Sequence, residues 1–166
     1  PTANLKLASG IAPIMQMLNM GINVAFGTDG PASNNDLDLF EEMRLAALLA
    51  KVTPHDPTAL PAKTALRMAT RGGAKALRLE KTIGSLEVGK LADIIVVETD
   101  TIHNTPHFRF NPDAVYSQLV YAAKSSDVQH TICHGQILMR DRQLLTIDDK
   151  AIRAEVDTYA DAVGRF

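Results

Sequence analysis

One carboxylate in this sequence occupies a position that suits chemistry. Asp29 lies between Gly27-Thr28 and Gly30, directly after the apolar run 22–26. In parallel α/β folds, the strand ends that lead into a following helix form the functional face of the molecule. A carboxylate placed there can bind a metal ion or move a proton, and flanking glycines let a ligand approach closely. The alternative is an ordinary turn, which the spacing alone favours, because Asp-Gly is a common turn pair.

The histidines, which are the next candidates for metal ligands, do not form a binding pattern. His103 and His107 are four residues apart, but the proline between them argues against a helix that presents both on one face. The two histidines that flank Cys133 would lie on one face of a strand, with the thiol on the other. We interpret all four as surface or turn residues. The sequence also lacks HxH, HExxH, GxSxG and GxGxxG motifs, so it does not support hydride transfer or P-loop chemistry.

The overall composition is that of an ordinary soluble domain. The chain has 166 residues, 46% of them hydrophobic, and a formal net charge of -2. With no basic run, it has no electrostatic reason to bind nucleic acid or an anionic membrane, and no apolar run approaches the ~20 residues of a membrane span. The single cysteine, Cys133, rules out an intrachain disulfide and a cysteine-rich zinc site. We therefore expect a cytoplasmic protein in a reducing compartment.

The segments around this carboxylate predict helices that alternate with a buried strand. The run 22–26 lacks polar alternation except at Asn23, which is typical of a parallel strand covered on both faces. After the loop, apolar residues recur at helical spacing through 35–51, and Asn35 or Asp36 is the expected N-cap. Further helices are predicted at 11–20, 61–71 and 74–79.

From about residue 82 the pattern changes from helices to strands. The β-branched run 94–97 predicts one strand, and two more are predicted on either side of a His134-Gly135-Gln136 turn. The tail, 148–163, predicts an amphipathic helix whose apolar side carries Ile152, Val156, Tyr159 and Val163. We therefore divide the chain into units 1–81, 82–147 and 148–166.

Several stretches taken together resemble a known family. "NLKLASGIAP", "GINVAFGTDGPASNNDLDLFEEMRLAALL", "ALRMAT" and "IGSLEVGKLADIIVV" occur in this order between Asn4 and Ile152. They resemble the C-terminal part of a metal-dependent amidohydrolase, and within that superfamily most of all the 5-methylthioadenosine/S-adenosylhomocysteine deaminases. The individual pieces are short, but their order and spacing make the match specific to the superfamily.

The resemblance implies an α/β fold, namely the C-terminal portion of a (β/α)₈ TIM-type barrel, its last strand and flanking helices, joined to the C-terminal share of a small β-sandwich. Asp29 matches the aspartate that follows the eighth strand and completes the metal site. The other ligands in such enzymes are histidines on earlier strands, and none of them is in this sequence. Because the chain also begins at Pro1 without an initiator methionine, we expect a fragment whose partner is the missing N-terminal half.

The activity implied by the resemblance is hydrolytic deamination of an adenosine-type nucleoside to the inosine-type product and ammonia. A Zn²⁺ ion, or Fe²⁺, would activate water for attack on C6 of the adenine ring, and Asp29 would accept the proton and help to pass it to the leaving ammonia. Ser33 and Asn34 either touch the substrate or simply shape the loop and cap the next helix. The isolated chain is expected to be inactive, and we expect the enzyme to be a homo-oligomer.

Two other interpretations stay open at this point. A guanine deaminase or a chlorotriazine chlorohydrolase would share the same stretches and differ in its substrate. A protein of another class, a stand-alone α/β assembly module without a metal, would need none of this chemistry.

Overall fold

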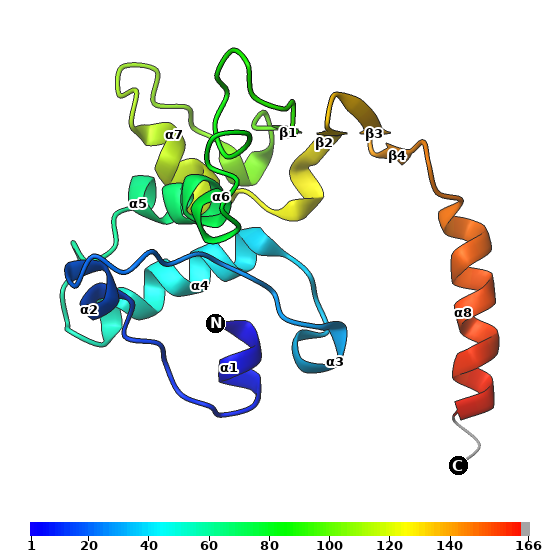
Figure 1. Ribbon diagram of the computed structural model, residues 1–166, viewed down its shortest axis with the longest axis horizontal. Coiled ribbons are helices and arrows are strands. Elements are labelled where there is room, and N and C mark those ends of the chain that lie inside the picture. The colour runs from blue at the N-terminus through cyan, green and yellow to red at the C-terminus, as the bar shows by residue number, and fades with distance from the viewer. Residues whose placement is uncertain (164–166) are drawn as a thin grey trace.

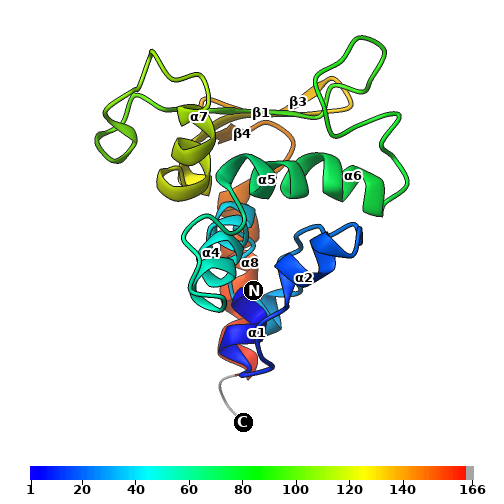
Figure 2. The ribbon, with the colours of Figure 1, turned by 90° about the vertical axis from the view of Figure 1, so that its left-hand side faces the viewer.

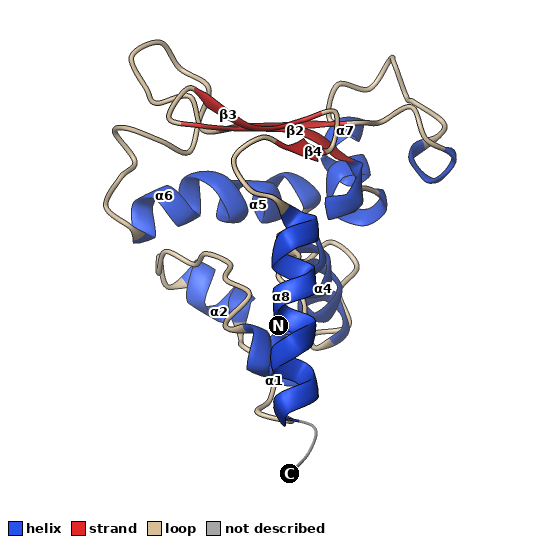
Figure 3. Cartoon of the chain, turned by 90° about the vertical axis from the view of Figure 1, so that its right-hand side faces the viewer, coloured by secondary structure: helices blue, strands red, loops and turns tan. Residues whose placement is uncertain are grey.

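The computed structural model describes residues 1–163. Figure 1 shows a body of helices, a small sheet at one end of it and a long helix that projects to one side. The sheet lies over α5 and α6, and α4, α2 and α1 follow beneath them (Figures 2 and 3). Among the described residues, no helix has both the length and the apolar character that crossing a membrane requires.

The first part of the chain contains α1 (Thr2–Lys6) and α2 (Ile14–Asn19). The predicted helix at 11–20 is therefore present but starts later, after Pro13, which occupies the N-cap. The predicted strand at 22–26 is not formed, because a strand exists through hydrogen bonds to a neighbouring strand and no described residue supplies one here. Val24 and Phe26 nevertheless pack on the helical core, as alternate residues of a strand would.

A short helix, α3 (Pro31–Asn34), precedes the long helix α4 (Leu39–Val52). The predicted N-caps of the long helix, Asn35 and Asp36, are both wrong, because Asp38 caps it. The Oδ1 atom of Asp38 accepts hydrogen bonds from the backbone N–H groups of Phe40, at 2.8 Å, and Glu41, at 3.2 Å. Asn35 instead ends α3 in the left-handed conformation, with φ 68°.

Three helical segments then follow one another without a break: α5 (Ala62–Arg67), the π-turn η1 (Met68–Gly72) and α6 (Gly73–Ala76). They confirm the predicted helix at 61–71, whereas the predicted helix at 74–79 ends early, at Ala76. The Asn23 side chain donates to the carbonyl oxygen of Gly72 at 3.0 Å, which ties this stretch to the segment before Asp29.

A second helical stretch, α7 (Ala114–Ser117) with the π-turn η3 (Gln118–Ala122), was not predicted. In sequence it falls in the unit 82–147, yet it packs on α4 and α5. Arg44 of α4 donates through Nε to the carbonyl oxygen of Val120 at 3.2 Å and also contacts that of Ala123. Helices α4, α5 and α7 with η3 are therefore one packed body.

The core of this body includes small side chains of α4, which let the other helices approach closely. Ala46 and Ala47 are fully buried, and Leu60 and Val120 fill the space next to them. The remaining buried members of the cluster are Ile14, Met43, Ala50, Ala65 and Met68.

The sheet contains four antiparallel strands in the order β1 (Ile94–Val97), β2 (Val128–Cys133), β3 (Gln136–Arg140) and β4 (Gln143–Leu144). The predicted strands and the turn between β2 and β3 are confirmed. His134 and Gly135 both have positive φ, 50° and 79°, as a tight hairpin turn requires. Strand β1 pairs with β2 across the intervening segment 98–127, with Ile94 opposite Ile132.

The chain continues into α8 (Asp149–Val163), which confirms the predicted amphipathic helix. Figure 1 shows α8 projecting away from the helical body. The apolar side chains on its predicted inner face are exposed, from 48% for Ile152 to 72% for Val163.

Candidate active site around Asp29

Asp29 lies at the end of the irregular segment that joins α2 to α3. Its φ is 63°, in the left-handed region, which aspartate tolerates better than most residues because its short polar side chain can hydrogen-bond locally. The neighbouring glycines, Gly27 and Gly30, have no atom within 4 Å of where a side chain would begin. The carboxylate is therefore exposed at an open turn that a ligand can approach.

Ser33 holds this carboxylate in place. Its hydroxyl donates to Oδ2 of Asp29 at 2.7 Å and lies 3.0 Å from the carbonyl oxygen of Gly30. The hydrogen bond from Ser33, followed by one from the backbone N–H of Gly30, holds the pKa of Asp29 below its ordinary value. At neutral pH the side chain is thus an ionised carboxylate, which can accept protons and coordinate a cation.

Asn34 is buried, and its side-chain amide faces the protein. Nδ2 donates to the carbonyl oxygen of Thr28 at 2.6 Å and to Oε1 of Glu42 at 2.7 Å. These two bonds use both amide hydrogens. The structure thus places Ser33 on the carboxylate of Asp29, whereas Asn34 joins the loop to helix α4.

Helix α1 borders the same loop. Lys6 donates from Nζ to the carbonyl oxygen of Ala32 at 3.4 Å and contacts the side-chain oxygen of Asn35. A mainly apolar cavity of about 160 Å³ lies between α1, α4 and the segment before Asp29, and Leu5, Ala25 and Gly27 are among the residues that line it. Gly27, two residues before Asp29, lies at the edge of this cavity.

The described residues supply only part of a metal site. Within residues 1–163, no group of three or more histidine, cysteine, aspartate or glutamate side chains is arranged to hold a metal ion. A catalytic zinc ion takes about three protein ligands and keeps a position for water. The ionised, exposed carboxylate of Asp29 fits as one of these ligands.

Three of the five histidines, His103, His107 and His134, are engaged with residues other than Asp29. Nε2 of His107 lies 2.8 Å from the carbonyl oxygen of Thr99, and Nε2 of His103 lies 2.8 Å from Oδ2 of Asp127. His134 forms the turn between β2 and β3.

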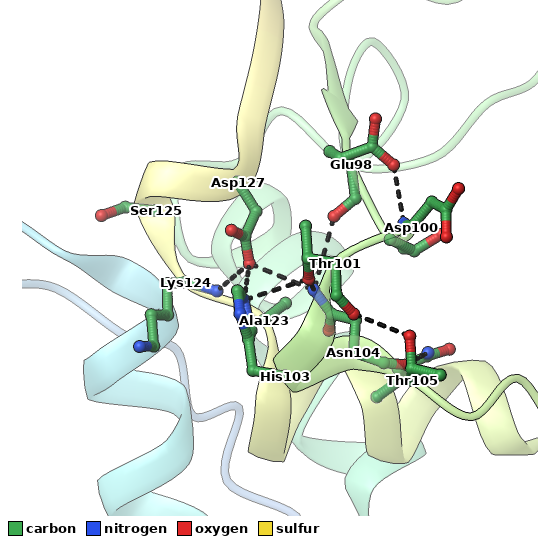
Figure 4. Close-up of polar contacts among 12 residues, drawn as sticks. Glu98, Asp100, Thr101, His103, Asn104, Thr105, Ala123, Lys124, Ser125 and Asp127 are labelled. Carbon is green, nitrogen blue, oxygen red and sulfur yellow. Dashed lines mark hydrogen bonds and ion pairs between the residues drawn. The ribbon is translucent and has the colours of Figure 1, made fainter.

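A second polar cluster surrounds Asp127, as Figure 4 shows. Besides contacting His103, its Oδ2 accepts hydrogen bonds from the backbone N–H of Lys124 at 2.9 Å and from Nδ2 of Asn104 at 3.3 Å. Burial acts to raise the pKa of Asp127, but these hydrogen bonds outweigh it and hold the pKa below its ordinary value. The cluster ties the 98–104 loop to the start of β2. Sequence reasoning missed it because its members come from two separate segments with no local spacing signal.

Comparison with known proteins identifies the family of this chain. Residues 1–138 match the Amidohydrolase family. The chain belongs to the amidohydrolase family. The resemblance predicted from the sequence and the predicted fold class are thereby confirmed.

Three relatives illustrate the similarity of this amidohydrolase chain. It is 56% identical over 148 residues to the 5-methylthioadenosine/S-adenosylhomocysteine deaminase of Syntrophobacter fumaroxidans, covering 89% of this chain and 33% of the relative. It is 52% identical to the 5'-deoxyadenosine deaminase of Methanosarcina barkeri, covering 96% and 35%. A zinc-bound crystal structure of an adenosine deaminase from Xanthomonas campestris matches it with a TM-score of 0.93 at 43% identity, covering 100% and 37%. The chain thus spans about a third of the length of these relatives.

Proposed function

We propose that residues 1–166 are the C-terminal part of a metal-dependent hydrolytic deaminase that acts on adenosine-type nucleosides. The observation that carries this proposal is the exposed, ionised carboxylate of Asp29, held by Ser33 at an open turn of an amidohydrolase chain. In this proposal Asp29 is both a metal ligand and the group that moves a proton.

The names of the relatives support an adenine nucleoside as the substrate. The two curated relatives are named for deaminases of adenosine derivatives that differ at the 5' position, and the structural relative is named an adenosine deaminase. What these substrates share is the amino group of the adenine ring. We therefore propose that the reaction converts 5-methylthioadenosine or S-adenosylhomocysteine to the inosine-type product, with release of ammonia from C6.

The residues of this chain have defined tasks in such a reaction. When bound, a Zn²⁺ ion, or Fe²⁺, supplies Lewis-acid activation that lowers the pKa of water toward ~7. Ser33 fixes the orientation of the Asp29 carboxylate through Oδ2. Asp29 accepts the proton of the attacking water and passes it toward the departing amine nitrogen, a transfer for which an ionised carboxylate is suited. Asn34 acts indirectly, because it holds the loop that carries Asp29.

We propose that the rest of the site comes from residues outside 1–166; in support of this, the described residues contain no metal-binding group of three or more side chains. We accordingly propose that the isolated chain is inactive and that it works together with the remaining part of an amidohydrolase. We also propose that the enzyme is a homo-oligomer in the cytoplasm. The chain is proposed to divide into units 1–81, 82–147 and 148–166.

The test replaces Asp29 by asparagine in the full-length enzyme and measures bound zinc and deamination of 5-methylthioadenosine. The control is Asp36→Asn, because Asp36 is an exposed aspartate of the same loop whose side chain makes no hydrogen bond or ion pair within residues 1–163. We expect Asp29→Asn to lose zinc and to lower kcat by roughly 10²–10⁴, while Asp36→Asn retains both. Unchanged zinc content and activity in Asp29→Asn would contradict the proposal.

A panel of substrates separates this proposal from related ones. Methylthioadenosine, S-adenosylhomocysteine, guanine and a chlorotriazine are offered to the same enzyme, and we expect turnover of the first two. A stable, metal-free monomer made from residues 1–166 alone would instead support a stand-alone assembly module.

A further inference from the structure

Glu42 is a buried carboxylate that the proposed chemistry does not use. It lies in the first turn of α4, and its side chain is 1% exposed. Burying a charge costs free energy unless hydrogen-bonding or charged groups bind it, so the groups that bind this carboxylate are informative. We propose that Glu42 is a positioning residue that fixes the loop carrying Asp29 and thereby sets the affinity of the site for its metal. This inference rests on the proposed role of Asp29 as a metal ligand.

A continuous path of hydrogen bonds joins Glu42 to that loop. Oε1 of Glu42 accepts from Nδ2 of Asn34 at 2.7 Å, and the same Nδ2 donates to the carbonyl oxygen of Thr28 at 2.6 Å. Thr28 directly precedes Asp29 in the chain, and Ser33, which holds the Asp29 carboxylate, directly precedes Asn34. Asn34, which Glu42 holds, therefore fixes the residue before Asp29 and is the chain neighbour of the serine that binds the Asp29 carboxylate.

The other oxygen of Glu42 reaches a second segment. Oε2 accepts a hydrogen bond from the backbone N–H of Thr2 at 3.2 Å. One carboxylate thus links the start of α1 to the turn after residue 26. Helix α4 can fix both, because Met43, Ala46 and Ala47 bury its adjoining face in the core.

The conformation of Asp29 explains why such a link is needed. A left-handed φ is sparsely populated for residues other than glycine and persists only where the surrounding structure enforces it. The hydrogen bonds from Asn34 and Ser33 supply that enforcement, and those to Glu42 gain strength from its charge.

Replacing Glu42 by glutamine breaks the link at nearly constant size. Glutamine offers one acceptor and one donor where the glutamate offers two acceptors. Its amide N–H group must face either Asn34 Nδ2 or the N–H of Thr2, both of which are donors. The matched control is Glu41→Gln, which makes the same charge change on the same helix, at a side chain with no hydrogen bond or ion pair within the described residues.

The first measurement is amide hydrogen exchange in the zinc-free, full-length enzyme. The amides of Ser33, Asn34 and Asn35, which bond to the carbonyls of Gly30 and Pro31, report on the loop. We expect Glu42→Gln to raise their exchange rates at least about tenfold, the effect of losing a hydrogen bond to a charged group. Glu41→Gln should leave them within about twofold. Equal exchange in both variants would overturn the proposal, whether or not the enzyme deaminates nucleosides.

The second measurement is the affinity for Zn²⁺, determined by competition with a chelator on folded enzyme. We expect Glu42→Gln to weaken Zn²⁺ binding about tenfold and to leave KM for 5-methylthioadenosine in the zinc-saturated enzyme nearly unchanged. A residue that only stabilises the fold would lower the melting temperature and leave the Zn²⁺ affinity of the folded fraction unaltered, so that outcome refutes positioning.

A double-mutant cycle tests the route of the effect. Asn34→Ala removes the middle of the hydrogen-bond path, so it should reproduce the loss of Zn²⁺ affinity. Combining it with Glu42→Gln should weaken binding little further. Additive losses would show that Glu42 acts by another route and would overturn the proposal. If wild-type enzyme binds no zinc while the loop exchange still responds to Glu42→Gln, the proposed function fails and the link between Glu42 and the loop stands.

Discussion

Two glycines of the segment that leads into the sheet offer a controlled test of packing. Gly84 and Gly89 have almost the same positive φ, 88° and 91°. A side chain added at Gly84 would place its Cβ 2.6 Å from Cβ of Ala74 and 3.3 Å from Cα of Arg71. One added at Gly89 would meet no atom within 4 Å. An alanine at either position would therefore meet similar backbone strain, but only an alanine at Gly84 would also clash with neighbouring atoms.

The size of each effect follows from this geometry. Forcing an alanine into a left-handed conformation costs roughly 1–2 kcal/mol at either position. Overpacking against Ala74, which is itself buried in α6, adds roughly 1–3 kcal/mol at Gly84 alone. We therefore expect Gly84→Ala to lose about 2–5 kcal/mol of unfolding free energy, and Gly89→Ala only about 1–2 kcal/mol.

Urea unfolding followed by the far-ultraviolet helix signal measures both losses. The two variants are compared with the wild type at constant slope, so that a shift of the midpoint reports stability alone. The reasoning is refuted if the two variants lose equal stability, because the clash would then contribute nothing.

Three further predictions concern the cap, the site and the second polar cluster. Asp38→Ala removes both cap hydrogen bonds of α4 and should cost about 1 kcal/mol in urea unfolding, with an unchanged midpoint as the contrary result. Ser33→Ala removes the main cause of the low pKa of Asp29, so carboxyl NMR should find that pKa raised toward 3.8, and a pKa equal to that of the wild type would contradict the assigned hydrogen bond. The folded pKa of Asp127 lies below 3.8, so Asp127 stabilises the fold above that pH, and the contribution is lost as the pH falls through the lowered value. Urea midpoints of Asp127→Asn should therefore be lower at neutral pH and fall less steeply in acid, whereas a parallel pH dependence would refute the assignment.

Helix α4 shows what the sequence can and cannot specify about the fold. Its apolar spacing and its C-terminal end were predictable, because they depend on local periodicity, although the helix starts at Leu39 and not at residue 35. Its cap was not, because the stretch "SNNDLD" offers several good capping residues and local chemistry does not choose among them. Tertiary structure decides: Asn35 already ends α3, which leaves Asp38 to begin α4. The unformed strand at 22–26 has a similar cause, since its apolar residues predict a strand but cannot supply the neighbour that one needs.

The candidate site was predictable in part for the same reason. The position of Asp29 between glycines after an apolar run is a local pattern. The importance of Glu42 is not, because Glu41 and Glu42 look alike as acidic residues in the first turn of a helix. A rotation of about 100° per residue turns Glu42 toward the loop and Glu41 away from it, and only the packing of α4 decides which of the two is buried. Asn34 was predicted as a loop residue, but in the structure it is the last residue of α3, and its bond to Glu42 joins two helices that local sequence does not connect.

Helix α4 also constrains how this protein can change. Glu42 reaches the Asp29 loop, Arg44 the end of η3, and Lys51 the carbonyl oxygens of Ala59 and Leu60 at 2.6 and 3.0 Å. A substitution that turns the helix about its axis would release all three contacts at once, so these three positions depend on one helix register. The inner side of α4 therefore keeps the register on which the other segments depend, whereas Leu48 on its outer side is 44% exposed within the described residues.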